Sequence, residues 1–120
     1  IRAMKLGGPH ESLADLAVLS PDANNHLLVV TSQGYGKRVD SDLFRPLSKC
    51  NLRGVKAVRL RESREGGEVP ADTMTALKAV GDDDELILIS SDGSAARLKS
   101  LNIPAQSRTA RGVVLRKSSD

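Results

Sequence analysis

Short apolar runs separated by polar turns form the most regular pattern in this chain. Residues 27–31 (LLVVT) and 86–89 (LILI) are rich in Leu, Val and Ile, and each run is followed by a glycine-containing turn and a second short run. Runs of this length, bounded by turn residues, are typical of β-strands joined in a hairpin. The pattern therefore predicts two β-hairpins, at residues 27–39 and 86–99.

Two further strands are predicted upstream of these hairpins, at Leu13–Leu19 and Thr73–Val80. Each segment is also compatible with a helix, and Ser12 with Asp15 could cap one in the first case. A strand is favoured because an Ala-Val pair in each segment stands at the same place ahead of turn-rich residues. Residues 55–60 (VKAVRL) place apolar side chains on both faces and predict a strand packed between neighbours.

The two hairpins are copies in a sequence repeat. The stretch LLVVTSQGYGKRVDS aligns with LILISSDGSAARLKS, which matches Arg38 with Arg97. Farther along, Arg-Gly-Val at 53–55 matches the same tripeptide at 111–113. About four short strands in each copy is typical of propeller blades. The predicted fold class is therefore all-β: a partial array of propeller-like blades of about four antiparallel strands each.

The repeat also gives the domain organisation that we expect. The first six residues, IRAMKL, resemble VKAVRL at 55–60, so residues 1–6 are interpreted as the end strand of a preceding blade. Residues 7–61 then form a first blade unit and residues 62–120 a second, within one continuous fragment of a longer array. Two blades leave strand edges unpaired, which favours strand-swapped self-association of the fragment.

Composition excludes several classes of protein. No apolar run approaches the roughly 18 residues that span a membrane, and one cysteine with two histidines provides neither disulfides nor a structural zinc site. One Tyr and one Phe are too few for a surface that stacks on bases. No phosphate-binding loop or catalytic motif is present, and the acidic run at 82–85 lacks calcium-loop spacing, so neither catalysis nor a cofactor is expected within these residues.

Charge is distributed in blocks, although the formal net charge is only +3. Residues 34–61 contain eight Lys or Arg and two acids, and residues 93–117 contain six and none, whereas residues 62–92 contain two and nine acids. A single basic block is usually a solvated face. Two blocks at equivalent places in a repeat indicate a recurring surface for nucleic acid or for an acidic partner.

Two sets of motifs carry a resemblance to a known family. The stretch LLVVTSQGYGKRV with the downstream RGVKAV resembles a blade of the DNA gyrase A C-terminal domain, and DDDELILISSDG with QSRTARGVVL is similar to another blade of that domain. The resemblance covers nearly the whole chain. Neither unit has the QRRGGxG box of gyrases: LSKCNLRG at 47–54 keeps two basic residues, and QSRTARG at 106–112 keeps the glutamine, one arginine and the last glycine.

This resemblance implies a six-bladed β-pinwheel, in which blades exchange strands with their neighbours and a basic rim wraps duplex DNA to support negative supercoiling. The implied partners are double-stranded DNA, the remaining blades and catalytic domain of the parent protein, and the gyrase B protein, with no membrane. ATP and magnesium are expected only for the parent enzyme, an ATP-dependent type IIA topoisomerase. The implied location is the bacterial cytoplasm or an organelle of bacterial origin.

Wrapping requires cations that meet phosphates along a rigid surface, and it requires no side chains that read bases. We expect Arg38 and Arg97, at matching positions after the two hairpin turns, to lie along one shared outer edge. The connections that follow carry further basic residues at equivalent places. The predicted DNA contacts are Lys37, Arg38, Lys49, Arg53, Arg97, Lys99, Arg108 and Arg111.

The residues leave two alternatives open. The equivalent C-terminal domain of topoisomerase IV would bind DNA with less wrapping. A propeller-type protein-interaction module would instead turn the basic blocks toward an acidic partner protein.

Overall fold

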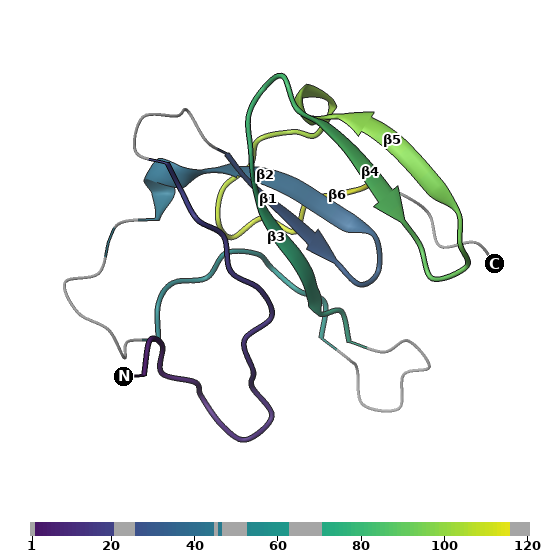
Figure 1. Cartoon of the computed structure of the whole chain (residues 1–120). Helices are drawn as coiled ribbons and strands as arrows, with labels where there is room; N and C mark the ends of the chain where they lie inside the picture. Colours follow the sequence, from purple (N-terminus) through teal and green to yellow (C-terminus); the bar gives the residue numbers. More distant parts are fainter. Residues whose placement is uncertain (1, 21–25, 45, 47–52, 63–70, 116–120) are drawn as a thin grey trace.

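The computed structural model describes residues 2–20, 26–44, 46, 53–62 and 71–115. Within these residues the chain forms strands and two short 3-10 helices (Figure 1). The strands are β1 (His26–Thr31), β2 (Tyr35–Asp40), β3 (Met74–Val80), β4 (Glu85–Ile89), β5 (Ala95–Lys99) and β6 (Val113–Val114); the 3-10 helices are η1 (Ser41–Leu43) and η2 (Ser100–Asn102). The prediction of an all-β fold is confirmed.

The strands form a four-stranded sheet in the order β3-β1-β2-β6 and a two-stranded sheet of β4 and β5. All these strand pairs are antiparallel, and the register of the hairpin places Leu28 opposite Arg38 and Val29 opposite Lys37. Strands β1 and β2 come from residues 7–61, whereas β3 and β6 come from residues 62–120. The four-stranded sheet therefore takes two strands from each unit of the sequence repeat.

Both predicted hairpins are confirmed. In each one a glycine at the turn donates its main-chain N–H to a carbonyl three residues earlier: Gly34 to Thr31 at 3.1 Å, and Gly93 to Ser90 at 3.0 Å. Both glycines have φ of 87°, a conformation that costs little only without a side chain. The repeat in the sequence is thus a repeat of turn geometry.

The segments predicted as strands at 13–19 and 55–60 have no regular secondary structure, so these two predictions are wrong. Leu16 and Val18 are 75% and 82% exposed. The main-chain N–H of Leu77 in β3 donates to the Asp15 carboxylate at 2.9 Å, so a side chain of the 13–19 segment meets the β3 backbone where a strand would offer main-chain carbonyls. In the second segment, Val58 is buried but Val55 is 56% exposed.

The core lies on both faces of the four-stranded sheet. Because successive side chains of a strand point to opposite faces, Leu28 packs with Val80 and Ile103 on one face, while Val29 packs with Val39 and Val58 on the other. Ile103 follows η2 in the second unit, so the second unit completes the core of the first.

Asp72 joins the turn of the β1–β2 hairpin to the start of β3. The residue is only 4% exposed, and its Oδ1 accepts hydrogen bonds from Ser32 Oγ at 2.8 Å, Gln33 N at 3.0 Å and Thr73 N at 2.9 Å. Burial of the carboxylate acts to raise its pKa, but the hydrogen bonds outweigh burial, so the pKa of Asp72 lies below its ordinary value.

This lowered pKa predicts a loss of stability in acid. A carboxyl group with a lower pKa in the folded than in the unfolded chain, where it is about 3.9, stabilises the fold above that value, and the contribution is lost as pH falls through the folded pKa. We expect Asp72→Asn to lower the free energy of unfolding by about 1–3 kcal/mol at pH 7 and to flatten its dependence on pH below about 4. Urea denaturation across this pH range measures both effects. Asp83→Asn, at an exposed turn position, is the control, and equal losses in the two variants would contradict the assignment.

Candidate nucleic-acid interface

Lys37, one of the predicted DNA contacts, is fully buried on β2, at 0% exposure. Its Nζ donates to three main-chain carbonyls, those of Ser107 at 2.6 Å, Arg108 at 3.1 Å and Ala110 at 2.8 Å. An enclosed ammonium that already has three acceptors cannot contact a phosphate. This position does not agree with the prediction that Lys37 lies on a DNA-binding rim. In the structure, Lys37 instead binds main-chain carbonyls inside the protein.

Arg38 is also buried, at 7% exposure. Its Nε donates to the carbonyl of Ile103 at 2.6 Å, and its NH1 lies 3.4 Å from Oδ1 of Asp82. The main chain of Arg38 is hydrogen-bonded to Pro104 and Gln106 as well. The connection after η2 therefore covers this arginine, which corrects the expectation that it lies on an outer edge.

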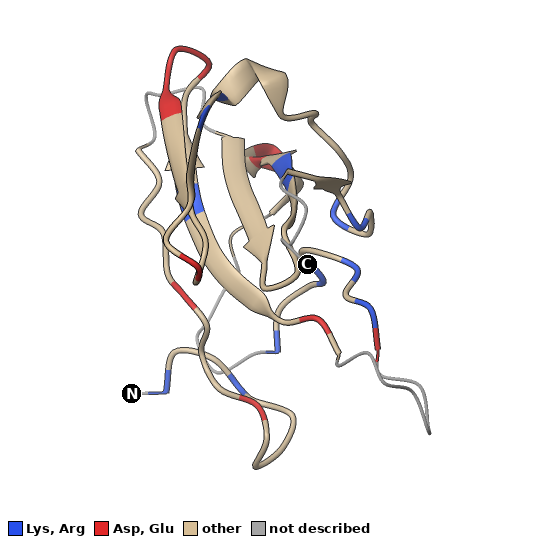
Figure 2. Cartoon of the chain, turned by 90° about the vertical axis from the view of Figure 1, so that its right-hand side faces the viewer, with Lys and Arg blue, Asp and Glu red and all other residues tan. Residues whose placement is uncertain are grey.

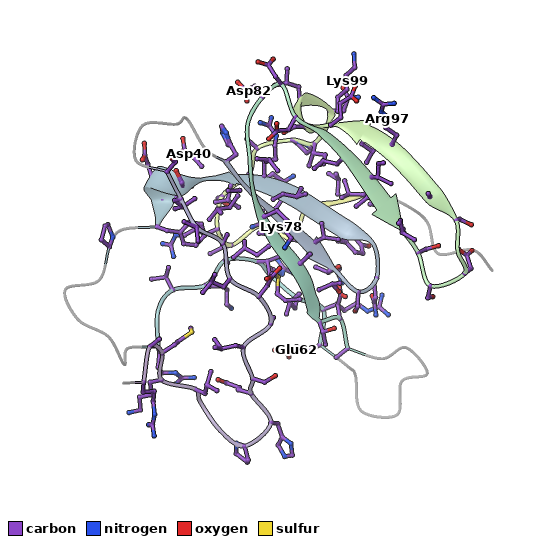
Figure 3. The ribbon with its side chains drawn as sticks, in the orientation of Figure 1. Asp40, Glu62, Lys78, Asp82, Arg97 and Lys99 are labelled. Carbon is purple, nitrogen blue, oxygen red and sulfur yellow. The ribbon has the colours of Figure 1, made fainter. Side chains whose placement is uncertain are left out.

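Arg97 occupies the matching position on β5 but has a different environment. Its side chain is 72% exposed and forms an ion pair with Glu85, in which Nε donates to Oε2 at 2.9 Å. Lys99 is exposed on the same face of β5, and Figure 3 shows both side chains directed away from the sheet. Arg38 and Arg97 therefore do not form one exposed edge, while DNA contact by Arg97 and Lys99 stays a prediction.

Basic residues also occur where residues 56–59 lie beside residues 108–110, and Arg53 lies three residues before Lys56. The main-chain N–H of Arg59 donates to the carbonyl of Ala110 at 3.1 Å, and NH1 of Arg108 lies 3.4 Å from the carbonyl oxygen of Lys56. Figure 2 shows several Lys and Arg segments close to one another in the right half of the view. We call Arg53, Lys56, Arg59 and Arg108 the basic cluster.

The basic cluster presents largely uncompensated positive charge. Arg53, Lys56 and Arg59 are exposed, and Arg108 is half-buried. The ion pair recorded for these four within the described part of the chain joins Arg53 to Glu11 at 3.9 Å, between two exposed side chains. Exposed pairs of this length contribute little and exchange readily. The arrangement suits an anionic partner with spaced charges, such as a phosphate backbone.

Arg111 and Lys49 complete the predicted set. The guanidinium carbon of Arg111 lies 4.8 Å from the centre of the Tyr35 ring, a cation–π contact that fixes its orientation. Its Nε and one terminal nitrogen are buried and make no hydrogen bond within the described residues. Lys49 lies outside those residues. DNA contact by either one stays a prediction.

The sequence prediction missed Lys56 and Arg59, although a signal for them was present. In the alignment of IRAMKL with VKAVRL, Arg2 matches Lys56 and Lys5 matches Arg59. Two cations at this spacing thus occur in both of these segments, whereas Val114 stands at the place of Lys56 in the second unit. The prediction gave weight to the hairpins and to the box-like loops, and it treated the segment at 55–60 only as an apolar strand.

Other site types find no support in the part of the chain that the structure describes. Its His, Cys, Asp and Glu side chains form no group of three or more that could hold a metal ion. In the same residues, no helix is long and apolar enough to cross a membrane.

Comparison with known sequences gives a consistent family. The model of the DNA gyrase C-terminal domain, beta-propeller, matches residues 25–65 and 84–117. The DNA gyrase A protein of Synechocystis sp. is 35% identical over 108 residues, which cover 90% of this chain and 11% of that protein. The chloroplastic/mitochondrial DNA gyrase A protein of Arabidopsis thaliana is 32% identical over 113 residues, with 88% and 11% covered. This chain thus spans about a tenth of the length of these relatives.

Comparison with solved structures agrees on the fold. A DNA gyrase A C-terminal domain superposes with a TM-score of 0.66 at 27% identity, covering 81% of this chain and 31% of that one. The C-terminal domain of DNA topoisomerase IV gives the same TM-score at 16% identity, covering 84% and 32%, and shows the fold alone. The chain therefore belongs to the family of DNA gyrase A C-terminal domains and is a part of their β-pinwheel.

Proposed function

We propose that this chain binds duplex DNA without sequence preference through the basic cluster, as part of the DNA-wrapping surface of a gyrase A protein. The observation that carries the proposal is the pair of contacts, Arg59 to Ala110 and Arg108 to Lys56, that brings two arginine-containing segments from different repeat units together. In the parent protein, strand passage would require the catalytic domain and the gyrase B protein, and the remaining blades would complete the wrapping surface.

The chemistry of the cluster favours phosphates over bases. Its guanidinium and ammonium groups lie on an irregular surface segment and a loop rather than on a helix or strand that could enter a groove. Contacts of this kind release condensed counterions from DNA, so affinity falls with salt. If all four cations contact phosphates, the slope of log affinity against log salt is roughly −0.9 for each contact, or about −3.6.

A salt titration tests the proposal. Binding of the chain to two duplexes of equal length and unrelated sequence is measured by fluorescence anisotropy between about 50 and 200 mM salt. We expect equal affinities for the two sequences and a slope between about −3 and −4. A slope near zero, or a strong preference for one sequence, would contradict it.

A topological assay separates wrapping from the alternative of protein recruitment. Relaxed circular DNA is incubated with the chain and a nicking-closing enzyme, and the distribution of topoisomers is then resolved on a gel. A surface that bends DNA around itself shifts this distribution. A module that only binds an acidic protein leaves it unchanged.

A further inference from the structure

The buried ammonium of Lys37 lies at the centre of the loop that carries Arg108. Lys37 belongs to β2, in the middle of the four-stranded sheet, and its partners belong to residues 107–110 of the second unit. A lysine ammonium has three N–H donors and no acceptor. All three of its donors are therefore satisfied by loop carbonyls.

A lysine at this position is costly by itself. Burying a charge without a counter-ion is unfavourable, and burial lowers the pKa of Lys37. Among the described residues no carboxylate forms an ion pair with it. The negative ends of the carbonyl dipoles compensate the charge instead. The charged lysine can therefore be buried here only when the loop is folded around it.

Few other main-chain contacts hold this loop in place. Hydrogen bonds to the Arg38 backbone hold the connection as far as Gln106. Beyond that point, the described residues tie the loop to another segment through the main-chain hydrogen bond from Arg59 to Ala110. Without Lys37, the Arg108 carbonyl would lose its donor, while the carbonyls of Ser107 and Ala110 would each keep only a main-chain donor, from Ala110 and Arg59 respectively.

The second hairpin has no lysine at the position equivalent to Lys37. The position that matches Lys37 on β5 is Ala96. Strand β5 pairs only with β4 among the described strands, whereas β2 is also hydrogen-bonded to the connection at 104–106.

We infer that Lys37 is a positioning residue of the DNA interface. Its ammonium binds the carbonyls of Ser107, Arg108 and Ala110. This holds the loop so that the Arg108 guanidinium lies at the Lys56 carbonyl. Lys37 thus sets the affinity for DNA without touching DNA. This inference rests on the proposed function of the basic cluster.

A double-mutant cycle tests the inference. Duplex binding is measured for the wild-type chain, Lys37→Met, Arg108→Gln and the variant with both substitutions, with Lys78→Met as an exposed control. Loss of one phosphate contact costs about eightfold in affinity at 0.1 M salt, because affinity scales with salt to the power of about −0.9. We expect Arg108→Gln to show this loss, Lys37→Met to show most of it, and the double variant to bind no more weakly than Arg108→Gln.

The outcomes separate the two claims. If Arg108→Gln binds DNA as well as the wild type does, the assignment of the basic cluster fails. If Arg108→Gln is weakened but Lys37→Met is not, or if the two losses multiply in the double variant, the inference on Lys37 fails while the cluster stands.

A measurement on the wild-type chain does not depend on the folding of any variant. The ammonium protons of Lys37 are expected to exchange slowly with water in NMR spectra, because all three are enclosed and hydrogen-bonded, whereas those of the exposed Lys78 exchange fast. Fast exchange at Lys37 would overturn the inference. Lys37→Arg, which keeps the charge and donors, is expected to restore part of the affinity lost in Lys37→Met.

Discussion

Replacing Lys56 and Arg59 together by glutamine is expected to lower the affinity for duplex DNA about 60-fold at 0.1 M salt. The estimate follows from two phosphate contacts at about eightfold each. The slope of log affinity against log salt should become shallower by roughly 1.8, or 0.9 for each contact. Both side chains are exposed, so the substitutions remove charge without disturbing the core. Anisotropy titrations at several salt concentrations measure the affinity and the slope.

The control for this experiment must change the net charge equally. Lys78→Glu lowers the net charge by two, as the double substitution does, at an exposed residue of β3 that forms an ion pair with Asp15 at 3.6 Å. We expect it to change affinity by no more than about twofold, since a charge outside the interface acts only through screened, long-range forces. Equal losses in the two proteins would mean that net charge alone controls binding, and the basic cluster would then have no special role. Arg97→Gln with Lys99→Gln tests the predicted contacts on β5 in the same assay.

The hairpins could be predicted from sequence because their determinants are local. Gly34 and Gly93 each stand where the turn needs a positive φ. The strands before these turns have simple local patterns of burial: β1 has several successive buried residues, and in β4 exposed and half-buried residues alternate. The repeat strengthened the prediction, because two segments with the same pattern of strand and turn residues are expected to adopt the same structure. These features need no knowledge of the rest of the chain.

The environments of Lys37 and Arg38 could not be predicted in this way. Both residues follow a hairpin turn in a basic block, and nothing near them in the sequence distinguishes them from Arg97. Their burial comes from the connection at 103–110, some 65 to 73 residues farther along the chain. A count of charge finds basic residues, but only the packing of distant segments decides which of them face solvent.

The segment at 13–19 was predicted to be a strand, but it has no regular secondary structure. Its apolar residues satisfy the pattern of a strand, yet a strand exists only when a neighbour pairs with its backbone. In the structure the Asp15 carboxylate contacts β3 through the Leu77 N–H, and Leu13 remains 68% exposed. Pattern alone therefore predicts the tendency of a segment to form a strand, while the presence of a partner decides the result.

Ile103→Ala is expected to cost about 2–5 kcal/mol in the free energy of unfolding. Ile103 is 1% exposed and packs with Leu28 of β1 and Val80 of β3, so truncation leaves a cavity where the second unit closes the core of the first. Its carbonyl also accepts the Arg38 Nε hydrogen bond. A domain of this size has about 5–15 kcal/mol of stability in total, so the loss is a large share.

Leu101→Ala provides the matched comparison for this prediction. Leu101 lies two residues earlier, in η2, and is 60% exposed, so its truncation should change stability by no more than about 0.5 kcal/mol. Urea denaturation of both variants, followed by circular dichroism, compares the two losses at one temperature and pH. A small loss of stability in Ile103→Ala would mean that the packing of Ile103 against Leu28 and Val80 contributes little to folding. A large loss at Ile103 alone would mean that the second unit stabilises the sheet on which the loop that carries Arg108 is folded.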